Sequence, residues 1–368
     1  MKQKKEACSF KKTSIGGQAL IEGIMMRGPK RSAMAVRNPQ GEIVLEAWDN
    51  SPADKKKSVI DTLAKVPIVR GVINFAISMA SGYKCLMRSA EISGLEELEE
   101  EERQRKAEKK AEKLKKKNKD AVITESATDE KEISENVKTD EAVTESTAEK
   151  KEEKKENSVL MTVVGVISFI IAIGLSVCLF IWLPTFLYTL LCKPFPALAG
   201  NRFLQSLFEG ILKIAILVAY MACVSLMKDI RRTFMYHGAE HKTIFCYEAG
   251  LPLTVENVRG QRRFHPRCGT SFLIVMVLVS IFIGFFIPAS LPTALRSAIK
   301  LLLLPITMGL GYEFIKLAGR HDNVVTRILS APGLLMQRIT VFEPTDDMIE
   351  CAIAAVKEVI PDDGSDNF

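Results

Sequence analysis

Three of the chain's four histidines, His237, His241 and His265, lie close together, and Cys268 follows the last of them. If residues 234–248 are helical, His237 and His241 leave one helix face one turn apart, so both imidazoles could bind one metal ion. Glu240 lies beside the same face. The segment therefore has the H-x-x-E-H pattern, in which the glutamate acts as general base towards water activated by the metal. This pattern predicts a hydrolase.

An open metal site needs a third protein ligand. His265 and Cys268 are the nearest candidates in sequence, and Glu313 and His321 are further ones. Glu313 is informative because an ionisable side chain within an apolar stretch is costly and often functional. The candidate set predicts a divalent metal, of which zinc is the best match to histidine and cysteine ligands.

Three less specific interpretations of the same residues remain open. Glu240 could pair with Lys242 or Arg267 without any metal, and Glu313 could form a salt bridge with Lys316 or Arg320. A closed structural zinc site, which would fold the loop and catalyse nothing, could use all four clustered ligands, namely His237, His241, His265 and Cys268.

The elements that position these residues are divided between an apolar and a charged part. The 368 residues are 47% hydrophobic and 26% charged, and the formal net charge is +6. Residues 96–156 contain 16 basic and 21 acidic side chains, whereas the rest contains 34 basic and 23 acidic ones. This segregation excludes a single soluble globular domain.

Four apolar stretches approach the roughly 20 residues that a helix needs to cross a bilayer. They cover about 159–183, 208–226, 271–288 and 298–315, and Lys300 is tolerable near a span end because a long lysine side chain can reach the interface. The loop between the second and third stretch is rich in Lys and Arg, whereas the loops after the first and third hold only Lys193, Arg202 and Arg296. The positive-inside rule then places both termini, and the histidine loop, in the cytoplasm.

The remaining segments predict soluble elements. Residues 33–37 and 42–48 flank an Asn-Pro-Gln-Gly turn and predict a β-hairpin. Residues 66–90 predict a helix that lies on the membrane or against the spans. Residues 94–157 predict a solvated linker, because acidic runs adjoin the basic ones and argue against specific nucleic-acid binding. A capped amphipathic helix is expected from Thr345 or Asp346, with a stripe of Ile349, Ile353 and Val356.

Several separate motifs resemble the bacterial YqhQ family, a group of uncharacterised membrane proteins described as predicted metal-dependent enzymes. The motifs are GGQALIEGIMMRGPKRSAMAVRNPQGEIV (16–44), VPIVRGV (66–72), YHGAEHKTIFCYE (236–248), HPRCGTSF (265–272), GYEFIK (311–316) and PGLLMQRIT (332–340). The resemblance covers the chain outside 94–157, an insert that departs from the family pattern. It implies membership of the family and adds site candidates by position, namely Gln18, Glu22, Arg27 and Tyr312 beside those already named.

These observations predict a mainly α-helical, polytopic membrane protein of about four spans with a small cytoplasmic β-containing N-terminal part. Its expected divisions are 1–93, 94–157, 158–320 with the His/Cys loop at 228–270, and 321–368. The predicted function is a metal-dependent membrane enzyme, a hydrolase with its site at the cytoplasmic face. The alternative is a non-catalytic assembly or protein-export factor whose basic loop docks on anionic lipid or a membrane-protein partner.

Overall fold

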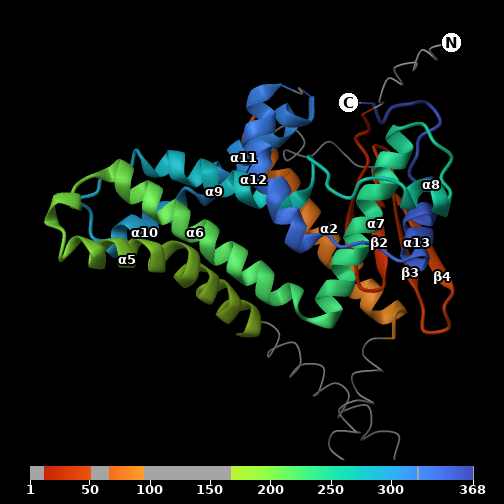
Figure 1. Cartoon of the computed structure of the whole chain (residues 1–368), viewed down its shortest axis with the longest axis horizontal. Helices are drawn as coiled ribbons and strands as arrows, with labels where there is room; N and C mark the ends of the chain where they lie inside the picture. The colour runs from red at the N-terminus through yellow and green to blue at the C-terminus, as the bar shows by residue number, and fades with distance from the viewer. Residues whose placement is uncertain (1–11, 51–65, 95–166, 321–322, 368) are drawn as a thin grey trace, which may run out of the picture. The chain divides into compact units, whose positions relative to one another are not determined.

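The computed structural model describes residues 12–50, 66–94, 167–320 and 323–367 (Figure 1). The chain divides into two compact units, one formed by residues 1–95 and 179–368 and the other by residues 96–178. The predicted linker lies outside the described residues from residue 95 to its end. The first unit contains an antiparallel sheet, the helices that cover it and a set of apolar helices.

The sheet has four strands in sequential order, β1 (Gly16–Leu20), β2 (Gly23–Arg27), β3 (Arg31–Arg37) and β4 (Ile43–Asp49). The predicted hairpin is confirmed as β3 and β4, which pair from Arg37 opposite Ile43 to Arg31 opposite Asp49. Its turn closes with the Asn38 N–H donating to Glu42, and Gly41 takes a φ of +87°, which glycine adopts without strain.

Both faces of the sheet are buried, because alternate residues of a strand point to opposite sides. Ile24, Met26, Ala33 and Ala35 pack on one side against α7 (Lys228–Glu248) and α13 (Asp346–Lys357). On the other side, a cluster of sheet residues packs against Cys85 of α2 (Val69–Ile92), namely Leu20, Met25, Met34 and Val36. The sheet therefore forms the middle layer of three.

The helix predicted for residues 66–90 is α2, which contacts both α11 (Leu304–Arg320) and the sheet. The predicted tail helix is α13, whose stripe of Ile349, Ile353 and Val356 is buried against α7 and the strands. Helix α8 (Val255–Arg259) lies beside α7 and α13. These contacts join chain segments from both ends of the sequence around α7.

The apolar helices include two that are long enough to cross a membrane, Ile167–Cys192 and Arg202–Ser225 (α6). The first contains a π-helical turn, Cys178–Trp182, followed by α5 (Leu183–Cys192) and the short η2 (Pro196–Leu198). A third span results if α10 (Thr293–Leu302) and Leu304–Leu317 of α11 count as one helix bent by 47°. Two to three long apolar helices in the described residues indicate a membrane-associated protein.

The four predicted spans are therefore only partly reproduced. The stretch at 271–288 forms α9 (Gly269–Gly284), an apolar helix of 16 residues that is shorter than the two helices long enough to cross a membrane. It packs against α6, α11 and α12 (Val324–Thr340). At about 1.5 Å per residue, α9 is roughly 24 Å long, less than the roughly 30 Å hydrocarbon core.

Two expectations about basic residues near the spans are wrong. Arg296, assigned to a loop, lies in α10 with 1% of its side chain exposed. Lys300, expected to reach the interface, is instead buried beside Glu209 of α6. Both side chains are buried because acceptors are available among the helices, namely Glu209 for Lys300 and backbone carbonyls for Arg296.

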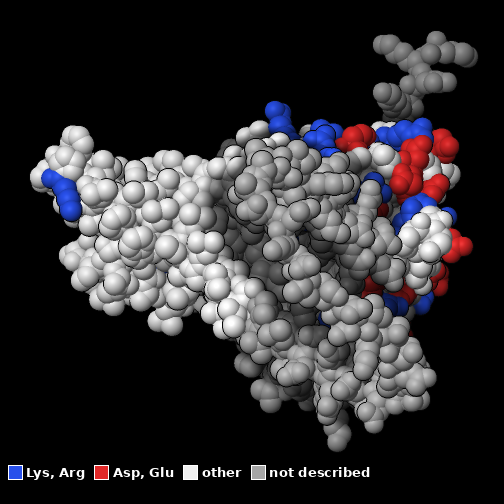
Figure 2. Space-filling view, turned by 90° about the horizontal axis from the view of Figure 1, so that it is seen from below, with Lys and Arg blue, Asp and Glu red and all other residues white. Residues whose placement is uncertain are grey.

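Charged side chains are unevenly distributed on the face drawn in Figure 2. Lys, Arg, Asp and Glu gather over the end that contains the sheet, α8 and α13, whereas the end built from α5, α6, α9 and α10 is almost free of them on this face. Large apolar side chains are exposed on α6, among them Phe203, Leu207, Ile211 and Tyr220. An apolar helical surface of this kind is what a bilayer would cover.

Candidate metal centre

Helix α7 positions two of the predicted ligands. His237 and His241 lie one turn apart, and their ring centroids are 4.4 Å from each other. The helix is held by its contacts with β1, β2 and α13, and Tyr236 and Ala239 are fully buried in that interface. Gly238 packs closely against the segment between α12 and α13, because a side chain there would meet the Phe342 carbonyl. The predicted helical arrangement of the histidines is confirmed.

Each of these imidazoles is oriented by a backbone carbonyl. His237 Nδ1 lies 3.1 Å from the Thr340 oxygen, and His241 Nδ1 lies 2.6 Å from the Arg263 oxygen. A carbonyl only accepts hydrogen bonds, so each Nδ1 carries the hydrogen and each Nε2 keeps a free lone pair. This is the arrangement that fixes the tautomer of metal-binding histidines.

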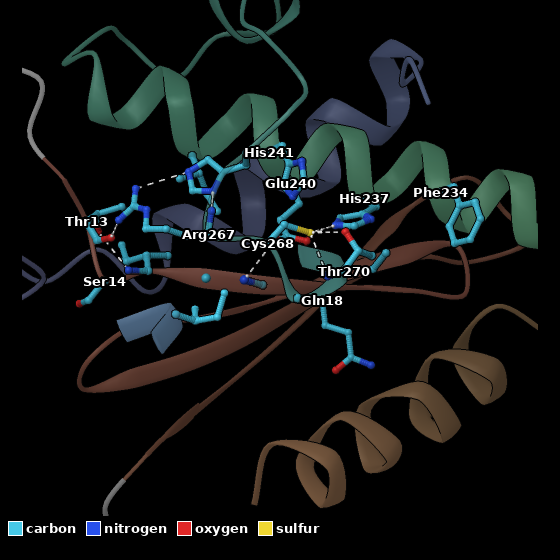
Figure 3. Close-up of a pocket in the computed structure, with 18 of the residues that line it drawn as sticks. Thr13, Ser14, Gln18, Phe234, His237, Glu240, His241, Arg267, Cys268 and Thr270 are labelled. Carbon is cyan, nitrogen blue, oxygen red and sulfur yellow. Dashed lines mark hydrogen bonds between the residues drawn. The ribbon is translucent and has the colours of Figure 1, made fainter. Parts of the chain in front are cut away.

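Cys268 completes a group of three. It is the N-cap of α9, and its Sγ accepts a hydrogen bond from the Thr270 N–H at 3.4 Å and contacts the Thr270 hydroxyl at 3.2 Å. Its Sγ lies 3.1 Å from His237 Nε2 (Figure 3). Ligand atoms of His237, His241 and Cys268 all lie within 4.8 Å of one another, so the group could hold a metal ion.

Glu240 lies beside this group on α7 and is buried. Its Oε1 accepts a hydrogen bond from the Gly17 N–H of β1 at 3.0 Å. Burial raises the pKa of Glu240 above the ordinary carboxyl value, although His237 and the Gly17 N–H oppose this. A carboxyl group with a raised pKa can take up and release a proton at moderate pH.

The group opens into a cavity of about 580 Å³. The cavity lies between β1 and α7, and the start of α9 and the last turns of α11 complete its wall, with Gln18, Tyr312 and Lys316 among the lining residues. In Figure 3 the Gln18 side chain points away from the histidines towards α2, where Gly82 leaves room for its amide. Tyr312 is held at the wall by a 3.0 Å hydrogen bond from Asn74 to its hydroxyl.

His265 lines the cavity but lies outside the three-ligand group. Its ring centroid is 5.5 Å from that of His241, and its Nε2 is 4.0 Å from a Glu248 carboxylate oxygen and 3.4 Å from Arg267. Burial lowers the pKa of His265 to about 4, and the neighbouring Glu248 only partly opposes this. Of the two ligands predicted nearest in sequence, the structure groups Cys268 with the α7 histidines.

The other predicted residues lie elsewhere. Glu313 forms a two-point ion pair with Arg70 of α2, where Lys316 or Arg320 was expected as its partner. Glu22, at the β1–β2 turn, pairs with Arg232 and accepts from the Tyr236 hydroxyl at 3.2 Å. Arg27 lines a second cavity of about 550 Å³ that shares Gln18 with the first. His321 lies outside the described residues.

The basic loop is largely engaged within the protein. Lys242 is buried and pairs with Glu343, and Arg267 pairs with the buried Glu248, so neither has the predicted role as partner of Glu240. Other loop arginines have partners too: Arg259 with Asp346, Arg263 with Glu343, and Arg262 over the Phe245 ring at 4.3 Å. These carboxylate partners neutralise much of the positive charge of the loop.

Several residues of the site were not predicted. Thr13 precedes β1, its N–H donates to Glu248 at 2.9 Å, its hydroxyl donates to Asp366 at 2.7 Å, and its carbonyl accepts from Arg267 at 2.7 Å. No local sequence signal could have identified these long-range contacts. Thr270 could have been found, because a short polar residue just before an apolar run is typical of a helix start.

Comparison with known proteins agrees with the resemblance seen in the motifs. The chain is 31% identical over 348 residues to the "Uncharacterized protein YqhQ" of Bacillus subtilis (strain 168), covering 94% of this chain and 92% of that protein. No solved structure matches. Residues 66–362, which contain α2 and the whole His/His/Cys group, match the family described as "Protein of unknown function (DUF1385)", and the chain belongs to this family.

Proposed function

We propose that the protein is a metal-dependent hydrolase of the bacterial cytoplasmic membrane. The observation that carries the proposal is the convergence of three ligand atoms, from His237, His241 and Cys268, within 4.8 Å of one another. The orientation of both imidazoles by backbone carbonyls supports it further, because a metal-binding histidine needs its second nitrogen anchored.

The donor set fits a borderline-soft divalent ion, and zinc is the best candidate. Three protein ligands are typical of catalytic zinc sites, whereas structural sites have four. His265, which would be the fourth ligand of a structural site, is instead engaged with Glu248 and Arg267. An ion held here would polarise a substrate group and activate water.

The surrounding residues have complementary roles in this proposal. Glu240 is the acid–base group, kept in place by the Gly17 N–H. The adjacent cavity of about 580 Å³ receives the substrate, and Lys316 and Tyr312 in its wall are candidates to contact it. The substrate is a molecule that reaches the cytoplasmic face, from the membrane or from the cytosol.

The proposed topology keeps four spans and cytoplasmic termini. Although α9 is short, it packs against α6, α11 and α12, and a helix packed against others need not match the bilayer thickness by itself. The Lys and Arg content of the loop after α6 supports a cytoplasmic position for the metal group. Membrane lipid and a membrane-protein partner remain proposed contacts of this arrangement.

A second chemistry is favoured by one distance. Cys268 Sγ is 3.1 Å from His237 Nε2 and caps the N-terminus of α9, an environment that stabilises an anion. Without metal, Cys268 could act as a nucleophile with His237 as its base. The non-catalytic docking function is less well supported, because Arg259, Arg262 and Arg263 already have partners within the protein.

Elemental analysis of the full-length protein, purified in detergent without chelator, tests the leading proposal. About one equivalent of metal is expected in the wild type and in Glu240→Gln, and a loss in His237→Ala. If the wild type has no metal and takes up none from zinc, manganese or iron, the metal-dependent function is wrong. Selective alkylation of Cys268 that requires His237 would then favour the nucleophile.

A further inference from the structure

A second group of charged residues lies inside the apolar helices. Glu209 and Lys213 of α6 and Arg296 and Lys300 of α10 are brought together there. Lys300 pairs with Glu209 and donates to the Thr185 hydroxyl at 2.7 Å, and Arg296 Nε is 3.7 Å from Glu209. Gln205 donates at 3.0 Å to Glu209 Oε1, the oxygen nearest Arg296 Nε, whereas Lys300 contacts Oε2. This cluster is separate from the metal group, whose residues lie on α7 and at the start of α9.

The cluster has more cations than anions. Among the described residues, Glu209 is the single carboxylate that pairs with any of the three basic side chains. Arg296 places one Nη on the carbonyls of Ile287 and Pro288, at 2.9 and 2.7 Å. Its other Nη is buried and has no hydrogen-bond partner within the part of the chain that the structure describes.

Lys213 has the weakest internal partner of the three. Its Nζ donates to the Ser280 hydroxyl of α9 at 3.4 Å. Lys213 and Lys300 both line a cavity of about 200 Å³ that also includes Ser280 and Thr307. The rest of the wall is mainly apolar, from Phe180, Ile181, Met276, Ile283, Ile287 and Leu303.

The cavity wall therefore has a polar part, formed by ammonium and hydroxyl groups, and an apolar part. Ammonium and hydroxyl groups are the donors that bind phosphate oxygens, and aliphatic and aromatic side chains accommodate an acyl chain. Excess positive charge within a membrane segment is costly unless an anion neutralises it. We infer that the cavity binds the phosphate of an anionic membrane lipid, with Lys213 and Lys300 at the phosphate and the acyl chain along the apolar wall.

Binding of phosphatidylglycerol to the full-length protein in mild detergent tests this inference, with native mass spectrometry counting the lipids retained per chain. One retained lipid is expected for the wild type. Lys213→Gln should weaken retention about tenfold or more, because it removes a partly buried cation from the phosphate. Ser280→Phe, which fills the cavity without changing its charge, should also remove the lipid.

Lys193→Gln is the matched control, because Lys193 follows α5 but is exposed to solvent. It should retain the lipid as the wild type does. Equal retention by the wild type, Lys213→Gln and Ser280→Phe would overturn the inference, and so would an equal loss in Lys193→Gln, which would indicate general surface attraction.

Inorganic phosphate, tested alone, distinguishes the source of the anion. A phosphatidylglycerol-dependent rise in melting temperature that needs Lys213, with no rise in inorganic phosphate, supports a lipid ligand. A Lys213-dependent rise in inorganic phosphate with none in phosphatidylglycerol would overturn it. All of these readouts are independent of the metal content, so this inference and the proposed function can fail separately.

Discussion

His237 Nε2 lies 3.1 Å from Cys268 Sγ, although 31 residues separate them in the sequence. The contact joins α7 to the first residue before α9, so it connects the layer on the sheet to the apolar helices. His241 lies close enough to both that the three side chains could bind one metal ion. The metal group therefore lies where the helix layer on the sheet meets the apolar helices of the same compact unit.

Replacement of the thiolate ligand tests this arrangement. Cobalt bound by Cys268 should show a sulfur-to-metal charge-transfer absorption, and Cys268→Ser should abolish that band and weaken metal retention, because serine is a poor ligand for soft ions. Cys85→Ser is the control, since Cys85 is also buried but packs under the sheet on α2. Loss of the band in Cys85→Ser, or its persistence in Cys268→Ser, would contradict the assignment.

Glu313 gives a second test of the ligand set. Its carboxylate is occupied by Arg70, so Glu313→Gln should keep the metal content of the wild type. The melting temperature should fall, because Arg70 then loses its partner at the α2–α11 contact. Elemental analysis and thermal unfolding in detergent measure the two effects. A metal-free Glu313→Gln protein would identify Glu313 as a ligand after all.

The sequence predicts the placement of the two α7 histidines better than it predicts the surrounding helices. The spacing of His237 and His241 requires only that α7 be helical, and the hairpin follows from alternation and a turn sequence, so both could be read locally. Cys268, and not His265, lies with the α7 histidines, and this placement depends on a long-range contact. The Gln337 side chain holds the His265 backbone at both its N–H and its carbonyl. Such a contact has no local signature.

The apolar helices were predicted less accurately for a different reason. A hydropathy profile treats Lys300 and Arg296 as residues that end a span or lie in a loop. Their burial depends instead on Glu209, which comes from another helix. Likewise, α9 packs closely against α6 at Gly284, where Ser206 leaves no space for a side chain. Pairing between helices, which composition does not record, decides both cases.

Neighbouring glycines offer a matched pair of variants at the cavity wall. A methyl group at Gly17 would lie 2.7 Å from the Met25 carbonyl oxygen and 3.0 Å from the Glu240 side chain, whereas one at Gly16 would meet nothing within 4 Å. Gly17→Ala should lower the free energy of unfolding by about 1–3 kcal/mol through overpacking. Gly16→Ala should change it by less than about 0.5 kcal/mol. Equal thermal or denaturant stability of the two variants would contradict this packing.

The buried pair of Glu248 and Arg267 should contribute strongly to stability. Glu248→Gln removes the charge of the buried carboxylate that Arg267 contacts, and breaking a buried pair costs about 3–5 kcal/mol. Thermal unfolding in detergent should show a large drop in melting temperature. Glu46→Gln is the control, because its pair with Arg88 is exposed and screened by solvent, so its melting temperature should remain near that of the wild type.

The same pair predicts a pH dependence. Burial alone would raise the pKa of Glu248, but His265, Arg267 and the Thr13 N–H hold it below the ordinary value. The stabilisation is therefore complete above the unfolded carboxyl pKa of about 4.3 and disappears as the pH falls through the lower, folded value. The difference in melting temperature between wild type and Glu248→Gln should be constant near neutral pH and shrink only in acid. A difference that shrinks already at neutral pH would contradict it.

The contact between Thr13 and Asp366 has a consequence for biosynthesis. These residues are 353 positions apart, and Thr13 precedes the strand that provides the Gly17 N–H to Glu240. The Thr340 carbonyl that orients His237 is also made late in translation. The apolar helices are therefore synthesised before the contacts that close this part of the structure can form. Under the proposed function, metal loading would follow the synthesis of these late segments, and a nascent chain stalled before residue 340 would lack the carbonyl that orients His237.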